Sequence, residues 1–298
     1  MSTSPPTASP PLADVSLVRR WRLSQWWYFA LLPAAGVDTF AIAMAPDGLS
    51  PTTLGRLLLA SGAAAAALAL GYYANAIGDR TMDTSAAKNP LLGRTLPAHW
   101  RLELAALGTT AVCLATLAGG PAAGGLALAS CLAGLSYSLG PRLKRVVGVG
   151  SLWNLAYFLP LLGLAVDLDP GKALAPQALA FAGLLLGNQW LHEAADREED
   201  RQGEVRTTVL ALGARRTAVL ALLWAALSLL AVRWALPAPP TSAAPLRLCA
   251  LAVALLVAPV ALVGAGDVPT AMARARRAQR LTGALAALLL HLEAHGHG

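Results

Sequence analysis

Charged side chains are scarce in this sequence. Asp and Glu number 16 and Lys and Arg 23, so that only 13% of the 298 residues are charged while 56% are hydrophobic. With a mean hydropathy of +0.55, the chain lacks the polar surface that an ordinary soluble domain needs. The composition therefore excludes a typical soluble protein and predicts an integral membrane protein.

Cysteine is also rare. The three cysteines all lie inside apolar runs and lack metal-ligand spacing, so we interpret them as packing residues. The first 13 residues have no apolar core and therefore predict no cleavable signal peptide. We expect residues 1–20 to form a disordered cytoplasmic tail and residues 21–298 to form one transmembrane domain, since no linker or internal repeat divides the chain.

Long apolar runs are what the sequence has in abundance. Nine of them approach the length needed to cross a bilayer, and they predict an all-α membrane bundle of nine transmembrane helices. Their approximate bounds are Trp26–Ala45, Leu57–Gly78, Leu102–Leu117, Ala123–Leu139, Val149–Val166, Ala175–Ala195, Thr217–Leu236, Leu246–Gly264 and Leu281–His291.

Basic residues are distributed unevenly between the loops. If alternate loops face opposite sides, 19 of the 23 Lys and Arg residues fall on the side of the amino terminus. By the positive-inside rule this side is cytoplasmic and the carboxyl terminus lies outside, in a bacterial-type cell membrane. The run Gly119–Pro121 predicts a tight turn on the far side.

Two cytoplasmic helix ends carry regularly spaced polar residues. Asn75, Asp79 and Asp83 recur every four residues, and so do Asp196, Asp200 and Glu204. On a helix this spacing places each trio on one face. Carboxylates in such positions repel one another unless a cation balances them, so two facing trios predict a Mg²⁺ site that holds a diphosphate. The alternative is that they are solvated helix ends.

Three motifs carry a family resemblance. Asn75, Asp79 and Asp83, followed by Lys88-Asn-Pro-Leu, resemble the first aspartate motif of the UbiA-type intramembrane prenyltransferase superfamily. Asp196, Asp200 and Glu204, followed by Arg206-Thr-Thr and Leu212-Gly213, are similar to the second. The segment from Tyr137 through Pro141 to Lys144 resembles the YxxxPxxK element of the family.

The resemblance implies nine helices around a central cavity in which two Mg²⁺ ions bind an isoprenyl diphosphate. Ionisation would give an allylic cation that an aromatic or lipophilic acceptor captures. The implied metal ligands are Asn75, Asp79, Asp83, Asp196, Asp200 and Glu204. Asp79, Asp83, Asp196, Asp200 and Lys144 are the implied catalytic residues. The expected substrate-binding residues are Asn75, Arg80, Lys88, Tyr137, Arg142, Asn154, Asn188, His192 and Arg206.

Two positions depart from the family pattern. Ala76 stands where the first motif usually has Asp, and Glu204 where the second motif ends in Asp. The loss of a carboxylate at position 76 would change either metal binding or the activation of the acceptor. It keeps a second reading open, a terpene cyclase that ionises the same diphosphate and closes the cation on its own double bonds.

Polar residues deeper in the apolar segments are candidates for the acceptor pocket. Asn188 and His192 continue the face of Asp196 into its helix, and Asn154 lies in the fifth segment. They could contact an acceptor or, for His192, take up a proton. Interhelical hydrogen bonding is the alternative. A cation-coupled transporter is a third function, disfavoured because the carboxylates gather at helix ends. The sequence leaves the acceptor, the isoprenyl chain length and the oligomeric state open.

Overall fold

A computed structural model describes residues 15–36, 50–83, 86, 88–168, 175–202, 206–235, 270–272 and 274–279. Every regular element in these ranges is helical, so the prediction of an all-α fold is confirmed there. The helices are α1 (Leu17–Arg20), α2 (Leu23–Trp26), η2 (Trp27–Leu31), α3 (Leu32–Gly36), α5 (Pro51–Asp79), α6 (Trp100–Ser138), η3 (Leu143–Arg145), α7 (Val149–Leu162), η4 (Gly163–Leu168), α8 (Ala175–Ala195), α9 (Arg197–Gln202), α10 (Thr208–Leu212) and α11 (Ala214–Ala235).

Helices α5 and α6 have the length and apolarity to cross a membrane. Helix α6 combines the two predicted spans on either side of the expected turn. Its backbone leaves helical geometry at Gly119 and Gly120. Gly120 has φ 74° and ψ −170°, a conformation that glycine adopts readily. A Cβ on Gly124 would overlap the Thr116 hydroxyl oxygen. The chain therefore doubles back, and α6 is a helical hairpin as the sequence predicts.

The amino-terminal elements differ from the single span predicted from Trp26 to Ala45. Up to Gly36 the chain forms α2, η2 and α3 in succession, with Trp26 at φ −137° between the first two. The Trp26 indole Nε1 donates to the Trp21 carbonyl at 2.6 Å, which holds this break in place. Residues 37–49 and the predicted spans Leu246–Gly264 and Leu281–His291 lie outside the described residues, so the count of nine helices stays a prediction.

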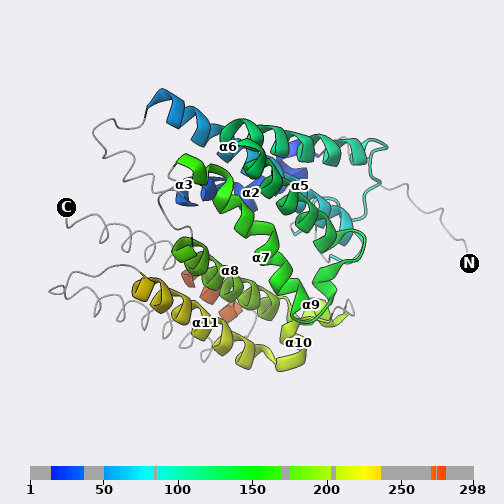
Figure 1. The fold of residues 1–298 in the computed structure, drawn as a ribbon. Helices are drawn as coiled ribbons and strands as arrows, with labels where there is room; N and C mark the ends of the chain where they lie inside the picture. Colours follow the sequence, from blue (N-terminus) through cyan, green and yellow to red (C-terminus); the bar gives the residue numbers. More distant parts are fainter. Residues whose placement is uncertain are drawn as a thin grey trace, which may run out of the picture.

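The helices form two packed groups joined by α7 (Figure 1). One core is rich in alanine from α5 and α6, and the other is built from α8, α10 and α11 together with Met272 and Ala275. Gly71 of α5 and Gly134 of α6 lie against the ring of Tyr157, where a Cβ on either would overlap the ring or its hydroxyl. The Tyr157 hydroxyl reaches the carbonyls of Ala67 and Leu68 at 3.2 and 3.1 Å. Small residues therefore let α5, α6 and α7 pack closely together.

Candidate active site

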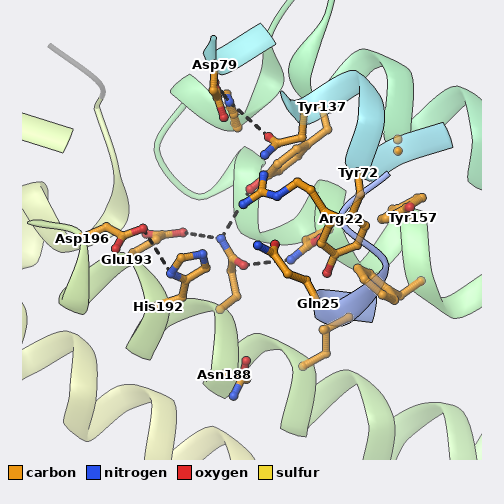
Figure 2. A pocket seen from close by; sticks show the side chains of 18 of the residues that line it. Arg22, Gln25, Tyr72, Asp79, Tyr137, Tyr157, Asn188, His192, Glu193 and Asp196 are labelled. Carbon is orange, nitrogen blue, oxygen red and sulfur yellow. Dashed lines mark hydrogen bonds and ion pairs between the residues drawn. The ribbon is translucent and has the colours of Figure 1, made fainter. Parts of the chain in front are cut away.

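A pocket of about 610 Å³ opens between the two helix groups (Figure 2). Most of the residues expected from the sequence line it together, although they come from helices α5 to α9 and the segments that connect them. These are Asn75, Asp79, Asp83, Lys88, Tyr137, Lys144, Asn154, Asn188, His192, Asp196 and Asp200.

Four expected residues are not brought into this lining. Arg80, Arg142 and Arg206 are described but do not border the pocket, and Glu204 lies outside the described residues. Arg142 has a different part to play, because its left-handed backbone (φ 50°) makes the turn from which Lys144 enters the pocket. Its position in the motif therefore contributes to the shape of the loop.

The first acidic motif lies at the end of α5. Ser50 caps the start of this helix by accepting a hydrogen bond from the Thr53 amide at 3.1 Å, and Pro51 occupies its first position. The helix ends at Asp79, one turn earlier than a face extending to Asp83 requires. The Asp83 amide still donates to the Asp79 carbonyl at 2.9 Å, so the last turn keeps both carboxylates on the pocket side.

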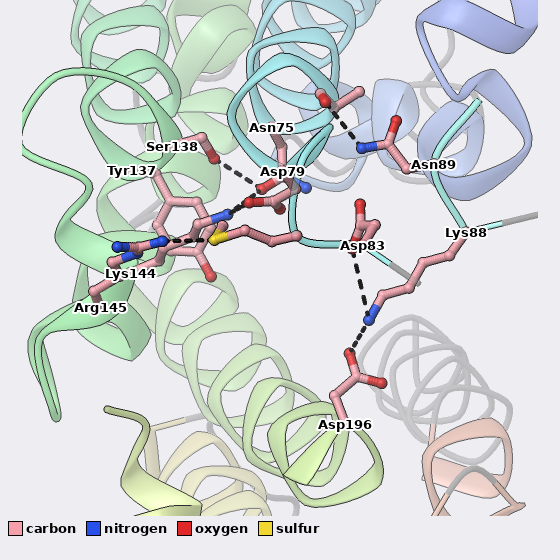
Figure 3. Close-up of polar contacts among 12 residues, drawn as sticks. Asn75, Asp79, Asp83, Lys88, Asn89, Tyr137, Ser138, Lys144, Arg145 and Asp196 are labelled. Atoms are coloured by element: carbon pink, nitrogen blue, oxygen red, sulfur yellow. Dashed lines mark hydrogen bonds and ion pairs between the residues drawn. The ribbon is translucent and has the colours of Figure 1, made fainter. Parts of the chain in front are cut away.

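Lys144 is the basic partner of this motif. Its ammonium contacts the Asp79 carboxylate and lies 3.3 Å from Asn75 Oδ1, which also accepts a hydrogen bond from Ser138 Oγ at 2.8 Å (Figure 3). Burial lowers the pKa of Lys144, and the charge of Asp79 acts in the opposite direction. The Asn75 amide and the Asp79 carboxylate thus share one cation.

Lys88 connects the two acidic motifs. Its Nζ lies 3.1 Å from Asp196 Oδ2 and 4.0 Å from Asp83 Oδ1 (Figure 3). Burial raises the pKa of Asp83, while a hydrogen bond with Asn89 lowers it. Asn89 is itself fully buried, and it anchors the loop by donating to the Ala76 carbonyl at 2.9 Å and accepting from the Leu91 amide at 2.9 Å.

The second acidic motif follows α8. Helix α8 ends at Ala195, and Asp196 interrupts the helical path before α9 begins. The predicted continuous helical face is therefore broken at its first aspartate. The Asp200 amide nevertheless donates to the Asp196 carbonyl at 2.9 Å, which preserves the four-residue step. His192 Nδ1 lies 3.2 Å from Asp196 Oδ2 and thus faces this motif.

Arg22 adds a cation that the three motifs do not contain. It joins α1 to α2 in a left-handed conformation with φ 55°, which is unfavourable for a residue with a Cβ. Its side chain lines the pocket, and its buried Nε has no hydrogen-bond partner in the described part of the chain. Burial lowers the pKa of Arg22, and the charges of Asp83, Asp79 and Asp196 oppose this shift. Arg22 is suited to bind an anion at the acidic end of the pocket.

A polar network missed by the motif comparison forms another part of the wall. Gln189 Oε1 accepts a hydrogen bond from Asn154 Nδ2 at 2.9 Å, and Gln189 Nε2 donates to Tyr137 Oη and Glu193 Oε1, both at 3.4 Å. Sequence reasoning followed the Asn188, His192 and Asp196 face and passed over Glu193, three residues before Asp196. A carboxylate in an apolar helix is the signal that could have revealed it.

Asn188 contacts a distant segment. Its Oδ1 accepts a hydrogen bond from Arg276 Nε at 3.1 Å, and its Nδ2 donates to the Arg276 carbonyl at 3.3 Å. Arg276 also lines the pocket, although it belongs to none of the three motifs. Both ends of the Asn188 amide are engaged, which favours interhelical hydrogen bonding for this residue.

Aromatic side chains form a further part of the lining. Phe29 of η2 and Phe158 of α7 border the pocket, with ring centroids 4.9 Å apart, and the Tyr157 ring lies 4.7 Å from that of Phe158. Such ring faces provide an apolar surface that also attracts positive charge. The pocket therefore combines an acidic and basic end with an apolar aromatic surface.

The donor set of the pocket fits Mg²⁺ when a phosphate supplies some of the ligands. Among the residues that the structure describes, no three His, Cys, Asp or Glu side chains converge closely enough to hold a metal alone. Mg²⁺ typically takes only one or two carboxylates and completes its coordination with water and substrate phosphates. Carboxylates on two sides of the pocket, with Lys88 between them, suit this mode of binding.

The profile of the UbiA prenyltransferase family matches residues 26–287. A UbiA homolog from Archaeoglobus fulgidus bound to DMAPP and Mg²⁺ has a TM-score of 0.71 at 15% identity, covering 95% of this chain and 99% of the other. A UbiA homolog from Archaeoglobus fulgidus bound to GPP and Mg²⁺ has a TM-score of 0.68 at 15% identity, covering 92% of this chain and 98% of the other. A structure of digeranylgeranylglyceryl phosphate synthase has a TM-score of 0.63 at 14% identity, covering 93% of this chain and 97% of the other. No curated protein sequence matched the chain.

Proposed function

Because the chain belongs to the UbiA prenyltransferase family, we propose that it is a Mg²⁺-dependent membrane enzyme that transfers an isoprenyl group from its diphosphate to an aromatic or lipophilic acceptor. The observation that carries the proposal is the Lys88 bridge at the pocket. Lys88 contacts Asp83 of the first motif and Asp196 of the second, which lies 108 residues after Lys88 in the sequence. Structural relatives described as bound to DMAPP or GPP with Mg²⁺ support the substrate class.

The charged end of the pocket binds the diphosphate in this proposal. The phosphate oxygens accept hydrogen bonds from Lys88, Lys144 and Arg22, which line the pocket. Further positive charge comes from residues outside the lining, which are Arg80, Arg142 and Arg206. The metal is held by the oxygens of Asn75, Asp79, Asp83, Asp196 and Asp200, with Glu204 completing the motif. Bound Mg²⁺, proposed as two ions, would neutralise charge on the leaving diphosphate.

The protein side chains direct the remaining chemistry. Lysine and arginine charges favour departure of the diphosphate with the electron pair of the carbon–oxygen bond, which leaves an allylic cation. Phe29, Phe158 and Tyr157 present ring faces that exclude water and stabilise that cation. Tyr137, Asn154, Asn188 and His192 border the space in which an acceptor would lie. The active site faces the cytoplasm in this proposal, following the distribution of basic residues.

Terpene cyclisation is the second candidate, and the aromatic surface is the observation that favours it. Aromatic rings would guide a cation that folds back on its own double bonds as well as one that meets an acceptor. Both functions require the same ionisation. They differ only in whether the product contains a second molecule.

The proposal is tested with the purified full-length protein in lipid nanodiscs. We would incubate it with Mg²⁺ and geranyl, farnesyl or geranylgeranyl diphosphate, and measure diphosphate release and organic products. We expect Mg²⁺-dependent release that Asp79→Asn and Asp196→Asn abolish and Glu198→Gln retains, because Glu198 is an exposed acid outside the pocket lining. Cyclic hydrocarbons in the absence of an acceptor would establish the cyclase. Release that does not depend on these aspartates would contradict both functions.

A further inference from the structure

Charge balance requires a proton acceptor in this pocket, given the proposed function. Ionisation converts the substrate into an allylic cation and a diphosphate anion. The cation becomes a neutral product only when one proton is lost, from the hydroxyl or ring carbon of an acceptor after the new bond forms, or from the isoprenyl carbon skeleton itself. Some group beside the apolar part of the pocket must accept that proton.

Most pocket carboxylates are committed to cations. Asp79 contacts Lys144, and both Asp83 and Asp196 contact Lys88. These groups are also the proposed Mg²⁺ ligands. His192 is engaged by Asp196 through Nδ1. Glu193 differs, because within the described residues it forms no ion pair and is held only by uncharged donors.

Hydrogen bonds from several uncharged groups fix the Glu193 carboxylate. Its Oε1 accepts from Ser151 Oγ at 3.1 Å and from Gln189 Nε2 at 3.4 Å, and its Oε2 accepts from the Thr208 amide at 3.2 Å. Ser151 is in turn held by the Trp190 indole at 3.0 Å. The neighbouring Val209 amide also hydrogen-bonds this carboxylate. Its donors therefore come from α7, α8 and the start of α10. Figure 2 shows Glu193 in the wall of the pocket near His192 and Asp196.

We propose that Glu193 is the catalytic residue that accepts the proton released when the allylic cation is converted into product. Rigid placement by Ser151, Gln189 and the Thr208 amide keeps the carboxylate aimed at the pocket during turnover. The proton passes from the cationic adduct to the Glu193 carboxylate, while the electrons of the broken C–H or O–H bond stay with the product. Glu193 afterwards returns the proton to water.

Two alternatives differ from proton acceptance by Glu193: the residue could have a purely structural role, or another group could act as the base. The contact with the Thr208 amide could serve to hold the start of α10, which has no side-chain cap of its own. The departing diphosphate could also take the proton. Glu193→Gln separates these roles, because glutamine matches the size of glutamate and can still accept from Ser151 or Thr208 but is not a base.

The experiment uses the full-length protein in nanodiscs with Mg²⁺ and geranylgeranyl diphosphate, with and without 4-hydroxybenzoate as a phenol probe. Diphosphate release is measured together with a product ratio, the amount of prenylated phenol or hydrocarbon divided by the amount of geranylgeraniol. In Glu193→Gln, we expect release within about threefold of wild type and a ratio lowered about tenfold or more, since water then quenches the cation and passes the proton to solvent. Glu198→Gln should leave both unchanged.

Two results would overturn the proposal. An unchanged product ratio in Glu193→Gln would assign the proton to diphosphate or water, and loss of release in proportion to a lowered melting temperature would assign Glu193 a structural role. If the glutamine variant does not fold, Glu193→Asp, which withdraws the carboxylate by one methylene, must shift the ratio in the same direction. No release by the wild-type protein would instead refute the proposed function.

Discussion

Lys88 Nζ lies 3.1 Å from Asp196 Oδ2, so that one ammonium joins the loop after α5 to the end of α8. The same group is 4.0 Å from Asp83. A cation between two acidic segments keeps them from repelling each other and would also meet an incoming diphosphate. The two halves of the site are therefore linked before any substrate binds.

Lys88→Met should weaken diphosphate binding more than folding. The lysine side chain is 31% exposed, so solvent screens its ion pairs and their contribution to stability is small. We expect KM for geranyl diphosphate to rise about tenfold, the scale of one charge-assisted hydrogen bond. Steady-state assays and thermal melting of the variant would measure both effects. Arg101→Met, which removes an exposed cation from α6, is the control, and an equal rise in KM there would contradict this role.

The buried pair of Lys144 and Asp79 should behave differently. Their side chains are only 13% and 14% exposed, so Asp79→Asn or Lys144→Met alone leaves an uncompensated charge and should cost about 3 kcal/mol. The double variant should recover much of that stability while staying inactive. Chemical denaturation and diphosphate release test this. Recovery of activity in the double variant would show that neither group acts on substrate.

Metal and diphosphate should stabilise the protein only in combination. Carboxylates from two segments approach one pocket without forming a metal cluster in the described residues, so phosphate oxygens are needed to complete the coordination. At about 100 times the dissociation constant, a bound ligand stabilises the folded state by about 2.7 kcal/mol. Thermal melting with Mg²⁺ alone, geranyl diphosphate with EDTA, and both together would measure the effect. Equal shifts in the presence of EDTA would refute metal-dependent binding.

Gly71→Ala should be destabilising by about 1–3 kcal/mol, because the new methyl group overlaps the Tyr157 hydroxyl where α5, α6 and α7 meet. Gly55 lies on the same helix with nothing within 4 Å of a built Cβ. Gly55→Ala should therefore be neutral or stabilising by up to about 1 kcal/mol. Melting of the two variants in one detergent gives the comparison, and similar values would show that the helices do not pack closely at Gly71.

Arg22→Gly should separate stability from binding. Glycine adopts the left-handed conformation of this position freely, which relieves about 1 kcal/mol of backbone strain. The same change removes a guanidinium from the pocket and should raise KM for geranyl diphosphate about tenfold. Arg22→Lys should keep part of the binding and all of the strain. If Arg22→Gly binds substrate normally, the arginine does not contact the diphosphate.

Several features of the fold follow from local sequence. The period of four in Asn75, Asp79 and Asp83 predicted which side chains meet, because a helical turn and its last hydrogen bond fix their directions. The Gly119–Pro121 turn was also correct, since glycine permits the backbone geometry found at Gly120. These are properties that a few adjacent residues determine on their own.

Other features depend on distant contacts. The break at Trp26 is held by a hydrogen bond to Trp21 that no periodicity reveals. Glu193 becomes notable only when α7 and α10 supply its donors, and Arg276 only when its segment packs on α8. A sequence shows that such residues are polar in an apolar region, but not which partners the fold gives them.

Ala76 is closely packed against its neighbours and also takes part in a hydrogen bond through its backbone. Its side chain is fully buried and does not line the pocket, and its carbonyl holds the Asn89 amide that anchors the Lys88 loop. An aspartate introduced here would be an unpaired charge within packed alanines. Introducing the family's usual aspartate at position 76 by a single change would therefore damage folding before it could add a metal ligand. The aspartate would be tolerated only if neighbouring residues changed with it.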